Sequence, residues 1–271
     1  MEPLKSHAVK EFHLNESEDD LHAEEIRNIG FTVIQSQLSN EELAQIRERI
    51  DAVYRRQVEE IGGETQLARI NDANVGRCLL GYDNYFVELA AHPRILSILG
   101  RLLGDYFILM SQNAIINNPV DEHYQITWHR DLNYQHFVSS RPLAVSALYA
   151  IDEFDSATGA THLLPASHKS EVFPSIEYVN RQETMIRVPA GSIILFDSMV
   201  FHRSGRNTSG NPRRAVNHIY TLPLIRQQIS LPRMLGNDYT HDPELRKLLG
   251  YDIETADSTL AWRQNKLKLS S

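Results

Sequence analysis

The spacing of apolar residues in the first hundred positions is mainly helical. Ser39 and Glu42 match a capping box, in which each side chain bonds to the other residue's backbone N–H. Gly62 and Gly63 then end the segment. Between these signals, apolar residues recur at steps of three and four, which places them on one face of a long helix: Leu43, Ile46, Ile50, Tyr54, Val58 and Ile61.

Shorter elements are predicted on both sides of this helix. Residues 21–29 suit a short helix, which Gly30 separates from a strand at 31–35. Apolar positions at 84–104 keep helical spacing, but Pro93 interrupts them and predicts two abutting helices. These helices are expected to brace the rest of the fold from outside.

From residue 106 the period of the apolar pattern changes from helical to two, and turn-rich stretches separate the segments. Many short strands within one domain favour a β-sandwich or jelly-roll barrel. The predicted fold is mainly β with flanking α-helices. Strands are expected at 106–118, 124–131, 143–151, 161–164, 184–188, 192–197 and 214–222.

The length of 271 residues suits one large barrel domain with appended helices. We divide 1–271 into an arm at 1–20, a helical support at 21–105, a jelly-roll core at 106–223 and a C-terminal extension at 224–271. The extension contains a predicted helix at 243–249, and its role is not predicted. Residues 62–82 have a weak pattern and form either a surface connection or a flap over a site.

Composition narrows the classes of partner. A formal net charge of -8 gives no general attraction to nucleic acid or to an anionic membrane. Cys78 is the single cysteine, which excludes an intrachain disulfide and a site of several thiolates. The N-terminus lacks the apolar core of a signal peptide, and no segment is apolar for long enough to span a bilayer. We expect a cytoplasmic protein; its oligomeric state is not predicted.

Candidate chemistry centres on Trp128-His129-Arg130-Asp131. In a strand, residues i and i+2 point to the same face, so His129 and Asp131 would present an imidazole and a carboxylate side by side. His202 is the best candidate for a third ligand. Two histidines and one carboxylate on one face of an octahedron are typical of non-haem Fe(II) oxygenases, because the opposite face stays open for substrate and O2.

Arg213 follows His202 by eleven residues. Arginine binds a carboxylate through two parallel hydrogen bonds and keeps its charge. A ferrous site together with such an arginine suggests a keto-acid cosubstrate.

With these motifs, the chain resembles the phytanoyl-CoA dioxygenase family of Fe(II)- and 2-oxoglutarate-dependent oxygenases, which includes ectoine hydroxylase. The resemblance rests on residues 128–131, on 156–168, on the run from His202 to Arg213, and on the opening Gly30-Phe31-Thr32-Val33-Ile34. It covers residues 22 to 223. It implies a double-stranded β-helix core of jelly-roll, cupin-like type.

The resemblance also implies a reaction and a ligand set. His129, Asp131 and His202 would bind Fe(II), and 2-oxoglutarate would be converted with O2 to succinate and CO2 while a substrate C–H bond is hydroxylated. Related halogenases lack the carboxylate ligand, so Asp131 favours hydroxylation. Desaturation, cyclisation or demethylation by the same centre remain alternatives, as does a metal- or ligand-sensing barrel without turnover.

Four further residues are assigned to the cosubstrate by the resemblance. Arg213 and Ser204 would bind its distal carboxylate, with Arg214 as the competing clamp. Asn117 would contact the keto-acid end, although the alignment can slip to Asn113 or Gln112. Thr161 either lines this pocket or packs in the core.

Substrate contacts are expected after Asp131 and at the barrel mouth. The residues there are polar, whereas a site for a long acyl chain would be mostly apolar, so the sequence favours a small polar metabolite over a long acyl chain. The alternative for these residues is a solvated loop without substrate contacts. The candidates are Asn133, Tyr134, His136, Arg141 and, on the strand that follows Arg213, Asn217.

Overall fold

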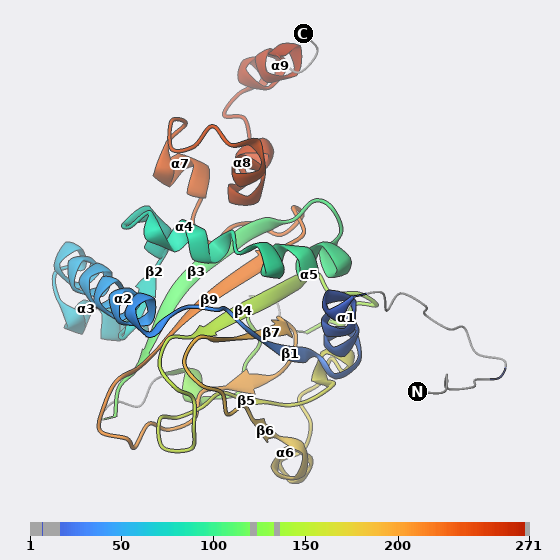
Figure 1. Cartoon of the computed structure of the whole chain (residues 1–271). Coiled ribbons are helices and arrows are strands. Elements are labelled where there is room, and N and C mark those ends of the chain that lie inside the picture. Colours follow the sequence, from blue (N-terminus) through green and yellow to red (C-terminus); the bar gives the residue numbers. More distant parts are fainter. Residues whose placement is uncertain (1–6, 8–16, 120–123, 133–135, 269–271) are drawn as a thin grey trace.

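In a computed structural model of the protein, two antiparallel sheets face each other and helices cover the outer face of the larger sheet (Figure 1). The structure describes residue 7 and residues 17–119, 124–132 and 136–268. This arrangement confirms the predicted jelly-roll core with helices packed against it.

The larger sheet has six strands, and its central strands are buried on both faces. Its neighbours pair antiparallel throughout, as expected for a jelly roll. In spatial order the strands are β1 (Phe31–Gln35), β7 (Ser192–Asp197), β4 (Ala144–Ala150), β9 (Arg213–Thr221), β3 (Ile108–Asn117) and β2 (Val75–Arg77).

The smaller sheet has three short strands in the order β6 (Thr184–Met185), β5 (His162–Leu163) and β8 (His202–Arg203). A second apolar cluster, which includes Ile194 and Phe196 of β7 and Leu163 of β5, fills the space between the two sheets. The open end of this interior is where the candidate site lies.

Alternation along β9 assigns its residues to two environments. Val216 and Tyr220 belong to the core between the large sheet and the helices. Arg213, Ala215 and Asn217 point the other way, into the space between the sheets. The period-two pattern therefore places polar site candidates inside the barrel while their neighbours hold the helices.

Four helices cover the outer face of the large sheet: α1 (Glu18–Ile29), α2 (Asn40–Ile61), α4 (Tyr85–Ala90) and α5 (Pro93–Leu103). The predicted capping box at Ser39 and Glu42 is confirmed by both of its hydrogen bonds. The other helices are α3 (Glu64–Arg69), α6 (Ile176–Gln182), α7 (Leu231–Leu235), α8 (Pro243–Leu249) and α9 (Thr259–Lys268).

The prediction of a strand at 124–131 is wrong. Residues 124–126 form a 3-10 turn, and His129 makes only an isolated bridge to His202. A bridge is enough to orient alternate side chains, so the shared direction of His129 and Asp131 does not require a regular strand.

Two boundaries also differ from the prediction. Helix α1 begins at Glu18, capped by Ser17, and Asp20 forms an ion pair with Arg101, so residues 18–20 belong to the helical support. The remainder of the predicted arm, apart from residue 7, lies outside the described residues. Residues 62–82 contain α3 and β2 rather than a plain connection, and β2 extends the large sheet.

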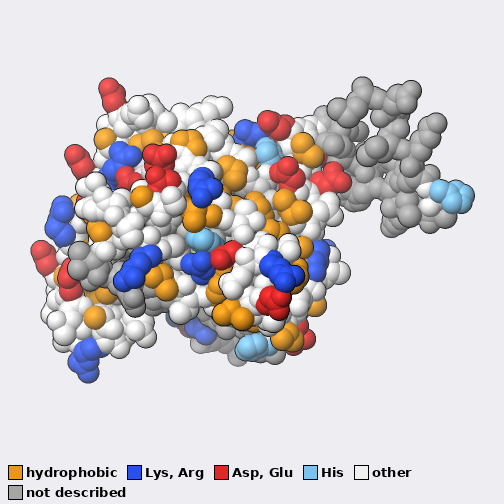
Figure 2. All heavy atoms as spheres, turned by 90° about the horizontal axis from the view of Figure 1, so that it is seen from below, with side chains coloured by type: hydrophobic (Ala, Val, Ile, Leu, Met, Phe, Trp, Pro, Cys, Tyr) orange, Lys and Arg blue, Asp and Glu red, His pale blue; other side chains and the backbone are white. Residues whose placement is uncertain are grey.

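Charged side chains of both signs are interspersed on the face seen in Figure 2, so this face presents no extended patch of one sign. Among the described residues, no helix is long and apolar enough to cross a membrane.

Asp197, at the end of β7, generates a prediction about pH-dependent stability. Burial raises the pKa of this carboxyl group to about 6, although the Met199 N–H donates to it. Its folded-state pKa exceeds its ordinary value, so the folded protein loses stability as pH rises through about 6.

Asp197→Asn should therefore raise the free energy of unfolding by about 1 to 3 kcal/mol at pH 8 and by much less at pH 4. The amide keeps an oxygen that accepts from Met199. Urea unfolding at the two pH values measures the difference. An equal effect at both values would show that the charge of Asp197 is not the cause.

Candidate metal centre and cosubstrate pocket

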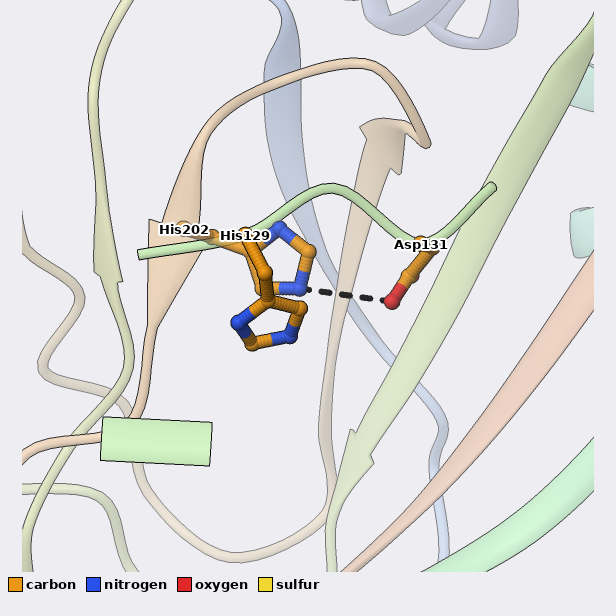
Figure 3. A group of neighbouring side chains, drawn as sticks. All are labelled: His129, Asp131 and His202. Carbon is orange, nitrogen blue, oxygen red and sulfur yellow. Dashed lines mark ion pairs between the residues drawn. The ribbon is translucent and has the colours of Figure 1, made fainter. Parts of the chain in front are cut away.

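The side chains of His129, Asp131 and His202 converge on one point (Figure 3). One ligand atom from each lies within 4.8 Å of the others. His202 Nε2 is 3.4 Å from Asp131 Oδ1, and the two imidazole centroids are 4.3 Å apart. The sequence placed these residues on one metal site, and the structure brings all three together.

Main-chain hydrogen bonds hold the two ligand-bearing segments against each other. The His129 N–H donates to the His202 carbonyl at 2.9 Å, and the His202 N–H donates to the His129 carbonyl at 3.0 Å. The Asp131 N–H donates to the Ser198 carbonyl at 3.0 Å. These bonds fix residues 129 and 131 in register against residues 198–202.

Arg130 points away from the ligands, as expected for the residue between them. Its guanidinium lies over the Phe201 ring, 3.8 Å from the centroid, and donates to the carbonyls of Ser167, Ser170 and Glu171. This buried side chain anchors the segment that carries His129 and Asp131.

The tautomer of each histidine follows from its hydrogen bond. His129 Nδ1 lies 2.8 Å from the Thr127 carbonyl, and His202 Nδ1 lies 3.0 Å from the Val200 carbonyl. A carbonyl oxygen only accepts, so each Nδ1 carries the proton and each Nε2 offers a lone pair. Carbonyl partners of this kind commonly orient metal-binding histidines.

Asp131 is held through one of its oxygens. Ser146 Oγ donates to Oδ2 at 2.5 Å and Asn217 Nδ2 donates to the same oxygen at 3.2 Å, while Oδ1 faces His202. Ser146 Oγ is also 2.8 Å from Ser198 Oγ. The carboxylate thus keeps one oxygen directed toward the two imidazoles.

The pKa values of His129 and Asp131 fit the charges that a metal requires. Burial, followed by the nearby His202, lowers the pKa of His129 to about 4, which leaves it neutral at pH 7. Burial opposes ionisation of Asp131, but His202 and His129 hold its pKa below the usual range. Burial also opposes the charge on His202, but the Asp131 carboxylate raises its pKa.

Arg213 is the most unusual charge in the interior. It is 2% exposed, and one guanidinium nitrogen donates to the Gly159 carbonyl and to Ser204 Oγ, each at 2.8 Å. Its Nε has no hydrogen-bond partner, and no carboxylate among the described residues forms an ion pair with it. Burial lowers its pKa to about 10, so it remains cationic at neutral pH.

Arg214, the competing clamp, points to the opposite face of β9. Its guanidinium donates to both carboxylate oxygens of Asp51 on α2, each at 2.8 Å, and it also contacts Asp152. Because Arg214 of β9 pairs with Asp51 of α2 on the outer face of the sheet, Arg213 is the one of these two arginines that faces the barrel interior.

Three other predicted cosubstrate residues surround Arg213. Asn117 lies opposite Arg213 in the β3–β9 ladder and donates to Ser204 Oγ at 3.1 Å. Ser204 and the buried Thr161 line the narrow pocket that also contains the triad and Arg213. Gln112, one of the alternatives to Asn117, instead donates to the Phe86 carbonyl outside this interior.

Gly159 shapes the end of this pocket. It adopts φ +78°, and an added Cβ would lie 2.5 Å from the Gly205 carbonyl oxygen and 2.6 Å from Asn117 Nδ2. Only glycine suits this backbone and this close approach. The turn can therefore bring its carbonyl to Arg213.

A larger cavity, of about 520 Å³, shares His129 and Asp131 with this pocket. Asn217 lines it, whereas His136 and Arg141 are exposed and are not among its lining residues. Asn133 and Tyr134 lie outside the described residues. Asn113, the other alternative to Asn117, lines this cavity rather than the pocket around Arg213.

Several residues of the site were not predicted from the sequence. Ser146 is a polar residue on the inner face of an otherwise apolar strand, and this position was the available signal. Arg77 and Arg226 line the larger cavity from segments far from the triad in sequence. Only the folded arrangement brings those segments together.

The residues present fit a ferrous ion and a keto diacid. Two imidazole Nε2 atoms and a carboxylate oxygen are a donor set that iron accepts. The interior guanidinium beside them forms no ion pair among the described residues, and a distal carboxylate would supply one.

Comparison with known proteins is consistent with this chemistry. The model of the phytanoyl-CoA dioxygenase (PhyH) family matches residues 26–215. Protein Rv1501 of Mycobacterium tuberculosis is 34% identical over 232 residues, which span 82% of this chain and 83% of the relative. The peroxisomal phytanoyl-CoA dioxygenase of Bos taurus is 22% identical over 224 residues, covering 69% of this chain and 64% of that protein.

Solved structures share the fold. The non-haem α-ketoglutarate-dependent epimerase SnoN from nogalamycin biosynthesis superposes with a TM-score of 0.56 at 16% identity, over 76% of this chain and 83% of its own. The non-haem monooxygenase ThoJ gives a TM-score of 0.59 at 21% identity, over 77% and 80%. Together with the family match, these findings show that the chain belongs to the phytanoyl-CoA dioxygenase family of iron- and 2-oxoglutarate-dependent oxygenases.

Proposed function

We propose that this oxygenase hydroxylates a C–H bond of a small polar metabolite and releases succinate and CO2. In this proposal His129, Asp131 and His202 bind Fe(II), and Arg213, Ser204, Asn117 and Thr161 bind 2-oxoglutarate. The observation that carries it is the triad beside a buried Arg213 that forms no ion pair among the described residues. Asn217 serves Asp131 as well as the substrate cavity.

When bound, iron and 2-oxoglutarate supply the oxidising chemistry with O2. The chain supplies position and charge. The backbone carbonyls of Thr127 and Val200 hold the Nδ1 protons of the two histidines, so both Nε2 atoms stay available. Ser146 and Asn217 hold one oxygen of Asp131 and leave the other for the metal.

Arg213 would bind the distal carboxylate of 2-oxoglutarate. Its guanidinium lies 4.3 Å from the Phe154 ring centroid and is held by Gly159 and Ser204. A buried cation without an ion-pair partner is costly, and a bound carboxylate offsets that cost. The same interaction would set the orientation of the keto acid relative to the triad.

The type of oxidation rests on the Asp131 ligand, because a complete triad favours hydroxylation. The fold does not decide it: solved relatives include an epimerase and a carbocyclase. A screen of metabolites tests the proposal by substrate-dependent succinate release with a mass gain of one oxygen atom. Loss of two hydrogens without that gain would instead support desaturation or cyclisation.

His129→Ala should abolish iron-dependent succinate formation while the melting temperature changes little, since a site ligand contributes little to the core. Succinate assay and thermal unfolding are measured together. His241→Ala, at an exposed position on the approach to α8, is the matched control and should retain turnover. Normal turnover by His129→Ala would show that His129 is not a ligand.

Arg213→Lys should raise the KM for 2-oxoglutarate about tenfold or more, because a single ammonium cannot reproduce the two parallel hydrogen bonds of a guanidinium. Steady-state succinate formation at varied 2-oxoglutarate gives the value. Arg214→Lys should leave this KM unchanged, since Arg214 pairs with Asp51. The reverse pattern would identify Arg214 as the clamp.

Ser146→Ala should weaken metal binding about tenfold, the usual effect of removing a group that orients a ligand. Titration with Co(II), followed by its visible absorption, measures the affinity without turnover. Ser36→Ala, at another buried serine that bonds to the Gly191 carbonyl, is the control. An unchanged affinity in Ser146→Ala would mean that Asn217 alone positions Asp131.

A further inference from the structure

Two cavities meet at the triad. The narrow pocket leads from His129, Asp131 and Asn217 to Arg213, and the larger cavity leads from the same three residues to Arg226. The first is assigned above to the cosubstrate. We assign the second cavity to the substrate. The charged side chains that line it therefore indicate which functional group the substrate has.

The described wall of the larger cavity is polar and unbalanced in charge. Asp131 is its single acidic residue, and that carboxylate belongs to the metal site. Arg77 and Arg226 also line it. Arg130 also lines the cavity, but its guanidinium donates to the carbonyls of Ser167, Ser170 and Glu171. Arg77 is paired with Asp72, so Arg226 is the lining arginine that forms no ion pair among the described residues.

Arg77 is held in a fixed orientation. It lies on β2, opposite Asn113 of β3, and its Nε edge donates to the Asp72 carboxylate. Its Nη1 reaches Gln228 Oε1 at 3.4 Å. This contact joins β2 to residues 226–228, which follow β9.

The segment that carries Arg226 is fixed at two neighbouring residues. Gln227 Nε2 donates to the carbonyls of Leu109 and Leu249, each at 2.9 Å, and the Gln228 N–H donates to the Met110 carbonyl at 3.3 Å. Arg226 itself is exposed and makes no ion pair or hydrogen bond within the described part of the chain. It is a positioned arginine with its donors available.

We infer that the substrate carries an oxyanion group, a carboxylate or a phosphate, which Arg226 binds beside Arg77 where residues 226–228 line the cavity. This inference rests on the proposed function. Guanidinium groups pair with both kinds of oxyanion through parallel hydrogen bonds. The volume of about 520 Å³ suits one small molecule whose other end reaches the triad.

The inference is tested with a panel of carboxylated and phosphorylated metabolites, each beside its neutral amide, methyl ester or dephosphorylated counterpart. Binding is followed anaerobically as a shift of the visible charge-transfer band of the protein loaded with Fe(II) and 2-oxoglutarate. Turnover is followed in air as succinate release. We expect charged compounds to shift the band and to be oxidised, and their neutral counterparts to do neither. Activity with the carboxylated or with the phosphorylated compounds then shows which oxyanion the site binds.

Variants of Arg226 locate the effect. Arg226→Gln should raise the KM for the active compound about tenfold or more, with the KM for 2-oxoglutarate unchanged, and Arg226→Lys should restore part of the loss. Arg181→Gln, at an exposed arginine on α6 far from the cavity in the chain, is the matched control.

The outcomes separate this inference from the proposed function. Absence of the charge-transfer band before any compound is added would contradict the iron and 2-oxoglutarate sites themselves. A normal band with a response to neutral compounds alone, or to no charged member of the panel, would overturn the oxyanion site only. An unchanged KM in Arg226→Gln would do the same.

Discussion

The site depends on the pairing of two short backbone segments at the open end of the barrel. Residues 129–131 and 198–202 exchange main-chain hydrogen bonds, and these bonds place both imidazoles and the carboxylate around one point. The pairing needs no regular strand at 124–131. It does need the Arg130 side chain beneath it, which ties the first segment to the carbonyls of residues 167–171.

Charge in the interior is organised around the same point. Asp131 is ionised, His129 is neutral, and Arg213 is a buried cation whose pKa burial lowers to about 10. Each of these groups is costly to bury alone. A metal ion would neutralise the Asp131 carboxylate, and a keto diacid would pair with the Arg213 guanidinium. These are the two small molecules that the family uses.

Much of this architecture could be predicted from sequence because it follows local rules. The capping box at Ser39, the proline at position 93 and the period-two strands correctly predicted α2, the break between α4 and α5, and most of the large sheet. The ligand triad was predicted from spacing and resemblance. The choice between Arg213 and Arg214 needed the structure, which places them on opposite faces of β9.

The parts that sequence could not supply depend on contacts between distant segments. Ser146 meets Asp131 only because β4 and the 129–131 segment face the same interior, and Arg77 reaches the cavity only because β2 joins the edge of the large sheet. The expected substrate residues after Asp131 were chosen by proximity in sequence. Of those that the structure describes, His136 and Arg141 are exposed rather than cavity-lining, and Asn217 comes from a distant strand.

The most direct test of the central claim is a crystal structure of the protein grown without O2 in the presence of Mn(II) and 2-oxoglutarate. The account predicts metal density bonded to His129 Nε2, Asp131 Oδ1 and His202 Nε2, with the distal carboxylate of the keto acid on Arg213. A metal bound elsewhere, or a keto acid whose carboxylate does not meet Arg213, would contradict it.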